Sequence, residues 1–230
     1  MLNVGIIGAN GYLGSALCLS CRHFPSYAVT AVTRQNYADC QGVEYDVLIN
    51  CAMPSARFWA KNNPTADFVE TVQKTADLVY GWRFNKFVQI STVSARCQLD
   101  TVYGRHKAAA EVLCPDNHLI VRLGAIYDHE MRKGVLIDMI QGKTVFVDAE
   151  SKYCFAARGF VADWIAANLL RSGVVEVGGR NAICLKDVAR HIGSRSTFVG
   201  DVDHQELLVP DPAFPEASEV LDFLGSWTKR

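Results

Sequence analysis

One tyrosine and one lysine stand at a spacing that suits proton transfer. Tyr103 and Lys107 are four residues apart in a segment, 101–113, whose composition predicts a helix, so both side chains project from one face. A free phenol has a pKa of about 10, and a neighbouring ammonium favours the phenolate. A tyrosine tuned in this way can give a proton to a carbonyl oxygen, or take one from a hydroxyl. We therefore expect Tyr103 and Lys107 to be catalytic.

Two hydroxyl side chains come shortly before this pair. Ser91 and Thr92 end the apolar run 86–92, which predicts a buried strand. Open α/β sheets bind their ligands at the carboxyl ends of strands. We expect the Thr92 hydroxyl to hold the same substrate oxygen as Tyr103, and Ser91 is a further catalytic candidate.

A glycine-rich loop follows the first predicted strand. Gly8, Gly11 and Gly14 form the pattern G-x-x-G-x-x-G between the apolar run 2–7 and a helical pattern over 12–23. Such glycines allow a tight turn, close approach of a pyrophosphate, and close helix–strand packing, and the helix N-terminus faces the phosphates. The alternative is a glycine-rich turn without a ligand. The loop predicts a dinucleotide site, whose candidate residues are Gly8, Asn10, Gly11, Tyr12, Leu13 and Gly14.

The end of the second predicted strand bears on which dinucleotide binds. An acid at this position favours NAD, whereas a basic residue accommodates the additional phosphate of NADP. The β-branched run 27–34 ends in Thr33-Arg34, without an acid. Arg34 could be an ordinary solvated side chain, but its position favours NADP as the cofactor, with NAD as the alternative.

The elements that must position these residues alternate along the chain. Further strands are predicted at 46–52 and 118–126, and a long helix at 64–82. This alternation predicts an α/β fold, a Rossmann-like doubly wound parallel sheet. The less regular second half predicts helices at 135–142, 161–171, 185–192 and 218–224, a hairpin of 144–147 with 153–155, and a strand at 174–177. We expect residues 1–230 to form a single domain, with a dinucleotide-binding core to about residue 128 and a small C-terminal substrate-binding elaboration from about 129 to 230.

Composition narrows the classes of partner. Half of the 230 residues are apolar, a fifth are charged, and the formal net charge is −1. No long-range field would collect phosphates, so nucleic acid is not expected as a partner. No apolar run approaches the roughly 20 residues of a membrane helix, and the first residues lack a basic lead-in. We expect no membrane partner and a cytoplasmic location. Cys18 and Cys21 form a C-x-x-C without a second pair, so buried thiols are expected rather than zinc or disulfides.

These motifs together resemble the short-chain dehydrogenase/reductase superfamily, in its extended branch of nucleotide-sugar epimerases, dehydratases and reductases. The resemblance rests on the glycine loop, Ser91-Thr92, and the run Tyr103-Gly-Arg-His-Lys107. In that branch one segment borders nicotinamide and substrate, and it is similar to Val121-Arg-Leu-Gly-Ala-Ile-Tyr127. The end of one strand in the same branch is similar to Asn50-Cys51-Ala52. The resemblance implies that Cys51, Ala52, Lys107 and Leu123 contact the cofactor, and that Ser94, Ala125 and Arg158 contact the substrate. Arg158 could instead form a structural ion pair.

The resemblance also implies an activity and an assembly. We expect an NADP-dependent reductase or epimerase of a nucleotide-linked sugar or a similar keto or hydroxy compound. The alternatives are a reductase of another small carbonyl compound and a non-catalytic, NADP-binding regulator. The relatives imply a homodimer formed through the segments 64–82 and 101–113.

The chain departs from the branch in four places. Few residues separate Arg34 from the strand at Asp46, so the usual third strand and its helix are expected to be cut down or missing. Thr71 and Ala125 stand where the relatives often have asparagine. Val93-Ser94 replaces the Asp-Glu pair, or its close variant, that dehydratases of this branch carry after the strand-end threonine. Since dehydration needs a further acid and base, we expect reduction or epimerisation instead.

Overall fold

The structure is a computed structural model, and it describes residues 1–227. Its first half alternates as expected: β1 (Leu2–Ile7), α1 (Tyr12–Arg22), β2 (Tyr27–Val32), α2 (Tyr37–Gln41) and β3 (Glu44–Asn50). The last four residues of β1 and of β3 are buried. Continuous burial on both faces is what a central parallel strand requires, and it explains why these runs are uniformly apolar.

Six strands of the described chain form one sheet, in the order β2-β1-β3-β4-β5-β9. The added strands are β4 (Arg83–Thr92), β5 (His118–Leu123) and β9 (Gly173–Val177). β1 pairs in parallel with β2 on one side and with β3 on the other, and β3 pairs in parallel with β4. The strand order therefore reverses between β1 and β3, which is where open α/β sheets bind ligands. The prediction of a Rossmann-like fold is confirmed.

β2 is the edge of this sheet, and only the five-residue helix α2 separates it from β3. The expected shortening between Arg34 and Asp46 is therefore confirmed. A cluster of large side chains closes this side of the sheet and includes Val32, Tyr45, Leu48, Trp82 and Phe87.

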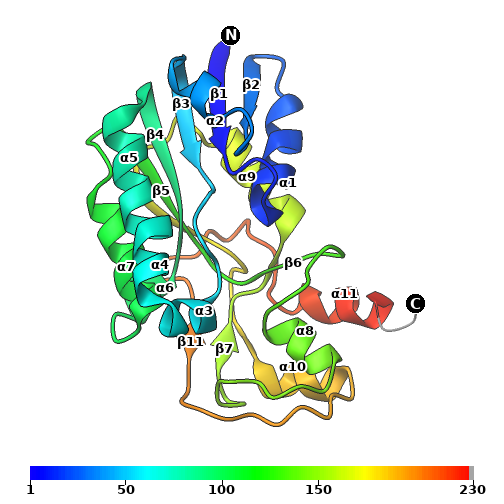
Figure 1. Cartoon of the computed structure of the whole chain (residues 1–230). Coiled ribbons are helices and arrows are strands. Elements are labelled where there is room, and N and C mark those ends of the chain that lie inside the picture. The colour runs from blue at the N-terminus through cyan, green and yellow to red at the C-terminus, as the bar shows by residue number, and fades with distance from the viewer. Residues whose placement is uncertain (228–230) are drawn as a thin grey trace. The chain divides into compact units, whose positions relative to one another are not determined.

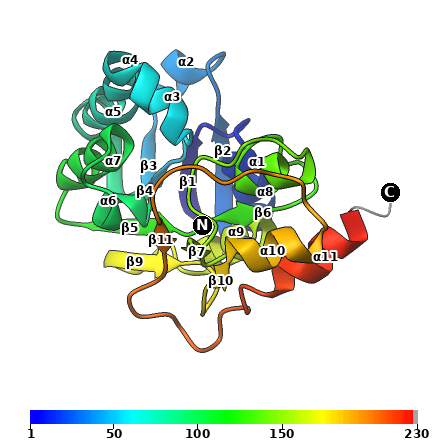
Figure 2. The ribbon, with the colours of Figure 1, turned by 90° about the horizontal axis from the view of Figure 1, so that it is seen from below.

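Helices cover both faces of the sheet. α4 (Pro64–Phe68), α5 (Lys74–Gly81) and α7 (Val102–Val112) lie on one face, and α1 lies on the other (Figure 1 and Figure 2). The short helices α3 (Arg57–Asn62) and α6 (Ser94–Cys97) pack against α7. The long helix predicted at 64–82 is interrupted by a π-helical turn, η1 (Val69–Gln73). π turns are rare and occur frequently at functional sites.

The described chain divides into two compact units. The first comprises Met1–Arg122 with Ala162–Val175, and the second comprises Leu123–Val161 with residues 176–227. Helix α9 (Arg158–Ala167) contributes residues to both. The functional division predicted near residue 128 stays a prediction.

The second unit is built from short elements. Its helices are α8 (Val135–Ile140), α10 (Leu185–His191) and α11 (Glu219–Trp227), and its strands are β6 (Ile126–Tyr127), β7 (Lys152–Tyr153), β8 (Ala156–Ala157), β10 (Ile183–Cys184) and β11 (His204–Gln205). β6 pairs with β8, and β7 lies between β10 and β11. Figure 2 shows the orange and red C-terminal segment that carries β11 and α11.

The predicted hairpin between 144–147 and 153–155 is wrong. Tyr153 pairs instead with Ile183 and with Gln205, and Val145 bridges to Phe198. A buried polar contact explains this choice, because the Tyr153 hydroxyl donates to Asp203 Oδ2 at 2.6 Å. In the part of the chain that the structure describes, no helix is both long and apolar enough to cross a membrane.

Candidate active site

The glycine loop lies at the point where the strand order reverses. Gly8 has φ +80°, a conformation that L side chains rarely adopt, and a Cβ there would lie 2.9 Å from Ala52 Cα. At Gly14 a Cβ would lie 2.2 Å from the Gly8 carbonyl oxygen. Both positions therefore require glycine, and the loop packs directly against the start of α1 and the end of β3.

This loop has the features of a phosphate cradle. α1 begins after Gly11, and its first turn carries no acidic residue. The helix N-terminus thus presents backbone N–H groups and a positive dipole end without a competing carboxylate. Tyr12 and Leu13 are half-buried in this first turn, and Asn10 is exposed beside it.

The end of β3 forms the neighbouring wall of the loop. The Cys51 N–H donates to the Ile7 carbonyl at 3.0 Å, which fixes Cys51 and Ala52 beside the end of β1. Burial raises the pKa of the Cys51 thiol. Cys51 is therefore an unreactive wall residue of this loop and not a nucleophile.

The turn after β2 carries Arg34, which is exposed. Asn36 holds this turn: its Oδ1 accepts from the Thr33 N–H at 2.7 Å, and its Nδ2 donates to the Ala31 carbonyl at 3.0 Å. Asn36 was not among the residues predicted from the sequence. The signal that could have found it is an asparagine two residues after Arg34, because asparagine side chains commonly form hydrogen bonds with the nearby backbone of a turn.

Tyr103 and Lys107 lie together in the first unit, on α7. The Thr101 side chain caps this helix by accepting from the Gly104 N–H at 3.0 Å. Both functional side chains are buried, with 7% of Tyr103 and 4% of Lys107 exposed. Lys107 Nζ lies 5.3 Å from the centroid of the Tyr103 ring. The i, i+4 spacing therefore places them side by side as predicted.

The electrostatics of Tyr103 differ from the expectation. Burial raises the pKa of Tyr103 to about 12, the Arg57 guanidinium opposes the rise, Asp67 adds to it, and a hydrogen bond with the Thr92 side chain opposes it. The net shift is therefore opposite to the lowering that the spacing with Lys107 suggested, because burial is the dominant effect. Tyr103 is therefore protonated at neutral pH. Its hydrogen bond to Thr92 places the phenol at the end of β4. Contact of Thr92 with a substrate oxygen stays a prediction.

Burial acts on Lys107 in the opposite direction, as expected for a base. It lowers the pKa of Lys107 from 10.5 to about 7, and the Asp67 carboxylate opposes the fall. A lysine with this pKa changes charge close to neutrality, so its immediate neighbours decide its state.

Ser91 has a partner other than Tyr103. Its hydroxyl donates to Glu111 Oε1 at 2.5 Å, and the Glu111 carboxylate also binds Arg122, with Nη2–Oε2 2.6 Å apart. Glu111 was missed from the sequence, although it stands four residues after Lys107 and therefore on the same face of α7. A catalytic role for Ser91 stays a prediction.

The remaining candidates are divided between the units. Ser94 is buried in the first unit, and its N–H donates to Thr92 Oγ1 at 3.2 Å. Leu123, Ala125 and Arg158 belong to the second unit. There Arg158 pairs with Asp128 and, through Nη2 at 2.7 Å, with Glu130. These contacts are the ion-pair alternative considered for Arg158, and its role toward a substrate stays a prediction.

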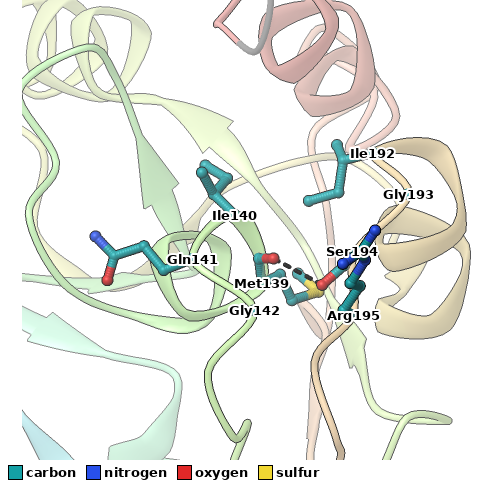
Figure 3. A pocket seen from close by; sticks show the side chains of 8 residues that line it. All are labelled: Met139, Ile140, Gln141, Gly142, Ile192, Gly193, Ser194 and Arg195. Atoms are coloured by element: carbon teal, nitrogen blue, oxygen red, sulfur yellow. Dashed lines mark hydrogen bonds between the residues drawn. The ribbon is translucent and has the colours of Figure 1, made fainter.

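A separate hollow occurs within the second unit, where the C-terminal ends of α8 and α10 meet (Figure 3). Its volume is about 290 Å³. The residues that line it are Met139, Ile140, Gln141, Gly142, Ile192, Gly193, Ser194 and Arg195. The Ser194 hydroxyl donates to the Met139 carbonyl at 2.6 Å, which ties the two helix ends together. None of the candidate site residues lines this hollow, and we interpret it as a gap between helix ends.

No protein-family model matches the sequence, and no curated protein is significantly similar to it. Solved structures do match the fold. A UDP-galactose 4-epimerase has a TM-score of 0.74 at 19% identity, and the match covers 99% of each chain. The dTDP-4-dehydrorhamnose reductase of Bacillus anthracis, in complex with NADP, has a TM-score of 0.74 at 16% identity, covering 99% of this chain and 100% of that one. A UDP-glucuronic acid 4-epimerase variant of Bacillus cereus, with NAD and a fluorinated substrate analogue, has a TM-score of 0.72 at 16% identity, covering 96% and 93%. The chain therefore has the fold of the NAD(P)-dependent epimerases, dehydratases and reductases of the extended short-chain dehydrogenase/reductase family.

Proposed function

We propose that this protein is an NADP-dependent oxidoreductase that reduces or epimerises a keto or hydroxyl group of a nucleotide-linked sugar. The observation that carries the proposal is the buried Tyr103, hydrogen-bonded to Thr92 and adjacent to Lys107. Supporting it, the structures of similar fold include a UDP-galactose 4-epimerase and a dTDP-4-dehydrorhamnose reductase.

The cofactor would be held by the chain's own backbone. Gly8, Gly11 and Gly14 let the loop fold closely on itself and against Ala52, because a Cβ at each would lie within 3.0 Å of a backbone atom. The first turn of α1 would supply N–H groups to a pyrophosphate. Arg34 is exposed directly after β2, at the sequence position where a basic residue accommodates the additional phosphate of NADP. When bound, the nicotinamide supplies hydride to a carbonyl carbon or accepts it from an alcohol.

Tyr103 serves as the acid in the reductive direction. Its pKa of about 12 keeps it protonated, so its Oη–H is available to the carbonyl oxygen of a substrate. Thr92 holds the phenolic oxygen and limits its rotation. As the proton leaves, the Lys107 ammonium stabilises the phenolate that forms. In the oxidative direction the same oxygen accepts the proton.

Dehydration fits the site less well, because a second acid and base would be required. The positions after Thr92 are Val93 and Ser94, and both are buried. The Asp163 carboxylate accepts a hydrogen bond from the Ser20 hydroxyl at 2.6 Å, and Asp128 forms an ion pair with Arg158. These two carboxylates therefore have structural partners.

The test is to incubate the chain with NADPH and a panel of 4-keto nucleotide-sugars, and separately with the parent hexoses. Stoichiometric consumption of NADPH indicates a reductase, and isomerisation without net consumption indicates an epimerase. A 4-keto-6-deoxy product from a parent hexose would overturn the assignment against dehydration. Tight NADPH binding without turnover on any substrate would favour the alternative of a regulator.

We also propose a homodimer formed through the helical segments 64–82 and 101–113. These segments carry exposed apolar side chains on the first unit: Phe68, Val69, Tyr80 and Val112, with Tyr80 76% and Val112 84% exposed. Large apolar side chains gathered on a surface are typical of an interaction site.

A further inference from the structure

Asp67 is a fully buried acidic residue, and acidic residues are rarely fully buried in soluble proteins. It lies on α4 with 0% of its surface exposed. Its Oδ2 contacts His106 Nδ1 at 2.7 Å, whereas its Oδ1 has no hydrogen-bond partner within residues 1–227. Burying a carboxylate with incomplete hydrogen bonding is costly, so its presence calls for a compensating interaction.

The compensation comes from α7. His106 immediately precedes Lys107 on that helix, and the Phe68 ring packs edge-on against the His106 ring at 5.6 Å. Asp67 is therefore held by an imidazole that is itself packed against Phe68. Its charge also acts on Lys107 and Tyr103, and for each of them it favours the protonated form.

We propose that Asp67 is a positioning residue that favours the ammonium form of Lys107, with His106 holding the Asp67 carboxylate in place. The inference rests on the proposed role of Lys107 in the reaction. It adds that the charge of Lys107 is set by a buried counter-ion on a neighbouring helix.

The other charged groups around α7 do not supply this function. α3 brings Arg57, a cation, which cannot favour a second cation beside it. η1 brings Glu70, which is half-buried and paired with Lys74. α6 contributes Arg96, which is also a cation. Glu111, further along α7, is bound by Arg122 and Ser91. Asp67 is thus the anion that acts on Lys107.

A merely structural reading is that the His106–Asp67 contact ties α4 to α7. The two readings differ in a measurable property, the titration of Lys107. If Asp67 only ties the helices, an uncharged side chain of the same shape leaves the Lys107 titration unchanged. If it supplies the counter-charge, the ammonium is lost at lower pH.

The experiment follows the ¹³Cε signal of Lys107 by NMR in chain labelled with ¹³C-lysine, without cofactor or substrate. The signal is assigned by its absence in Lys107→Met. Asp67→Asn is expected to move the Lys107 midpoint to lower pH, and each pH unit of movement lowers the ammonium fraction about tenfold above the midpoint. The matched control is Asp77→Asn, which removes an exposed carboxylate of the same helical segment that is bonded to Gln73. It is expected to leave the midpoint unchanged.

An unchanged Lys107 midpoint in folded Asp67→Asn would overturn the proposal. Asp67→Ser is the second variant, with the same expectation. Failure of both variants to fold would assign Asp67 to the fold instead, and would equally overturn it. Because the titration needs no substrate, its outcome is independent of whether turnover is found. Where turnover is found, Asp67→Asn should also move the basic limb of the kcat/KM profile to lower pH, a change that a helix tie alone would not produce.

Discussion

Replacing Lys107 with methionine is expected to make the protein more stable. Lys107 is 4% exposed, and burial lowers its pKa from 10.5 to about 7. Each tenfold loss of proton affinity corresponds to about 1.4 kcal/mol, so the burial of this ammonium costs at most about 5 kcal/mol. The net lowering of the pKa already includes the attraction of the Asp67 carboxylate, and that carboxylate keeps its contact with His106 when Lys107 is replaced. Relaxation, water penetration and the charge left on Asp67 all reduce the gain. We expect Lys107→Met to gain about 1–3 kcal/mol in the free energy of unfolding.

The gain depends on pH in a defined direction. Between pH 7 and 10.5, the unfolded chain binds a proton at Lys107 that the folded chain does not, so this residue makes the wild type more stable as the pH rises. The penalty is therefore complete below about pH 7 and absent above about pH 10.5. The advantage of Lys107→Met should be largest at or below neutrality and should shrink toward alkaline pH.

The assay is thermal unfolding of the wild type and Lys107→Met at several pH values. For a chain of this size, each kcal/mol corresponds to about 2–4 °C in Tm. Lys61→Met is the control, because Lys61 is exposed on α3. A Tm that falls in Lys107→Met at neutral pH, or a gain that grows with pH, would refute the reasoning.

Three further predictions concern the cofactor site and the assembly. Arg34→Ala should weaken NADPH binding and leave NADH binding nearly unchanged, measured by fluorescence titration; tighter NADH binding by the wild type would contradict the NADP preference. Gly14→Ala should weaken both cofactors and destabilise the fold by about 1–3 kcal/mol, because its Cβ would lie 2.2 Å from the Gly8 oxygen; Gly42→Ala, with nothing within 4 Å of its Cβ, is the control. Val112→Asp should dissociate the proposed dimer in light scattering, and a wild type that already has the 25.4 kDa monomer mass at micromolar concentration would count against the dimer.

The parts of the fold that rest on local sequence could be predicted. The run that forms β1, followed by Gly8, predicted a buried strand and a tight turn because each signal lies within a few residues. Tyr103 and Lys107 were found together for the same reason, since helical spacing alone places them on one face. The shortened segment between β2 and β3 was predicted from the small number of residues between Arg34 and Asp46.

Long-range pairings could not be predicted in this way. Tyr153 pairs with segments about 30 and 50 residues away, so nothing near it in the sequence indicated its partners. The contact of Asp67 with His106 joins two helices, and neither residue carries a sign of it. Burial was the other missing quantity. It raises the pKa of Tyr103, where spacing alone suggested that Lys107 would lower it.

The most direct test of the proposed chemistry is Tyr103→Phe. Turnover of whichever substrate is identified should fall by about 10²–10⁴-fold, the usual contribution of a positioned acid, whereas NADPH affinity should stay nearly unchanged because only the phenolic oxygen is removed. Tyr80→Phe is the matched control, since Tyr80 is 76% exposed and distant along the chain from Thr92 and Lys107. The account predicts loss of turnover in Tyr103→Phe alone. A Tyr103→Phe enzyme that turns over near the wild-type rate would contradict it and place the acid elsewhere.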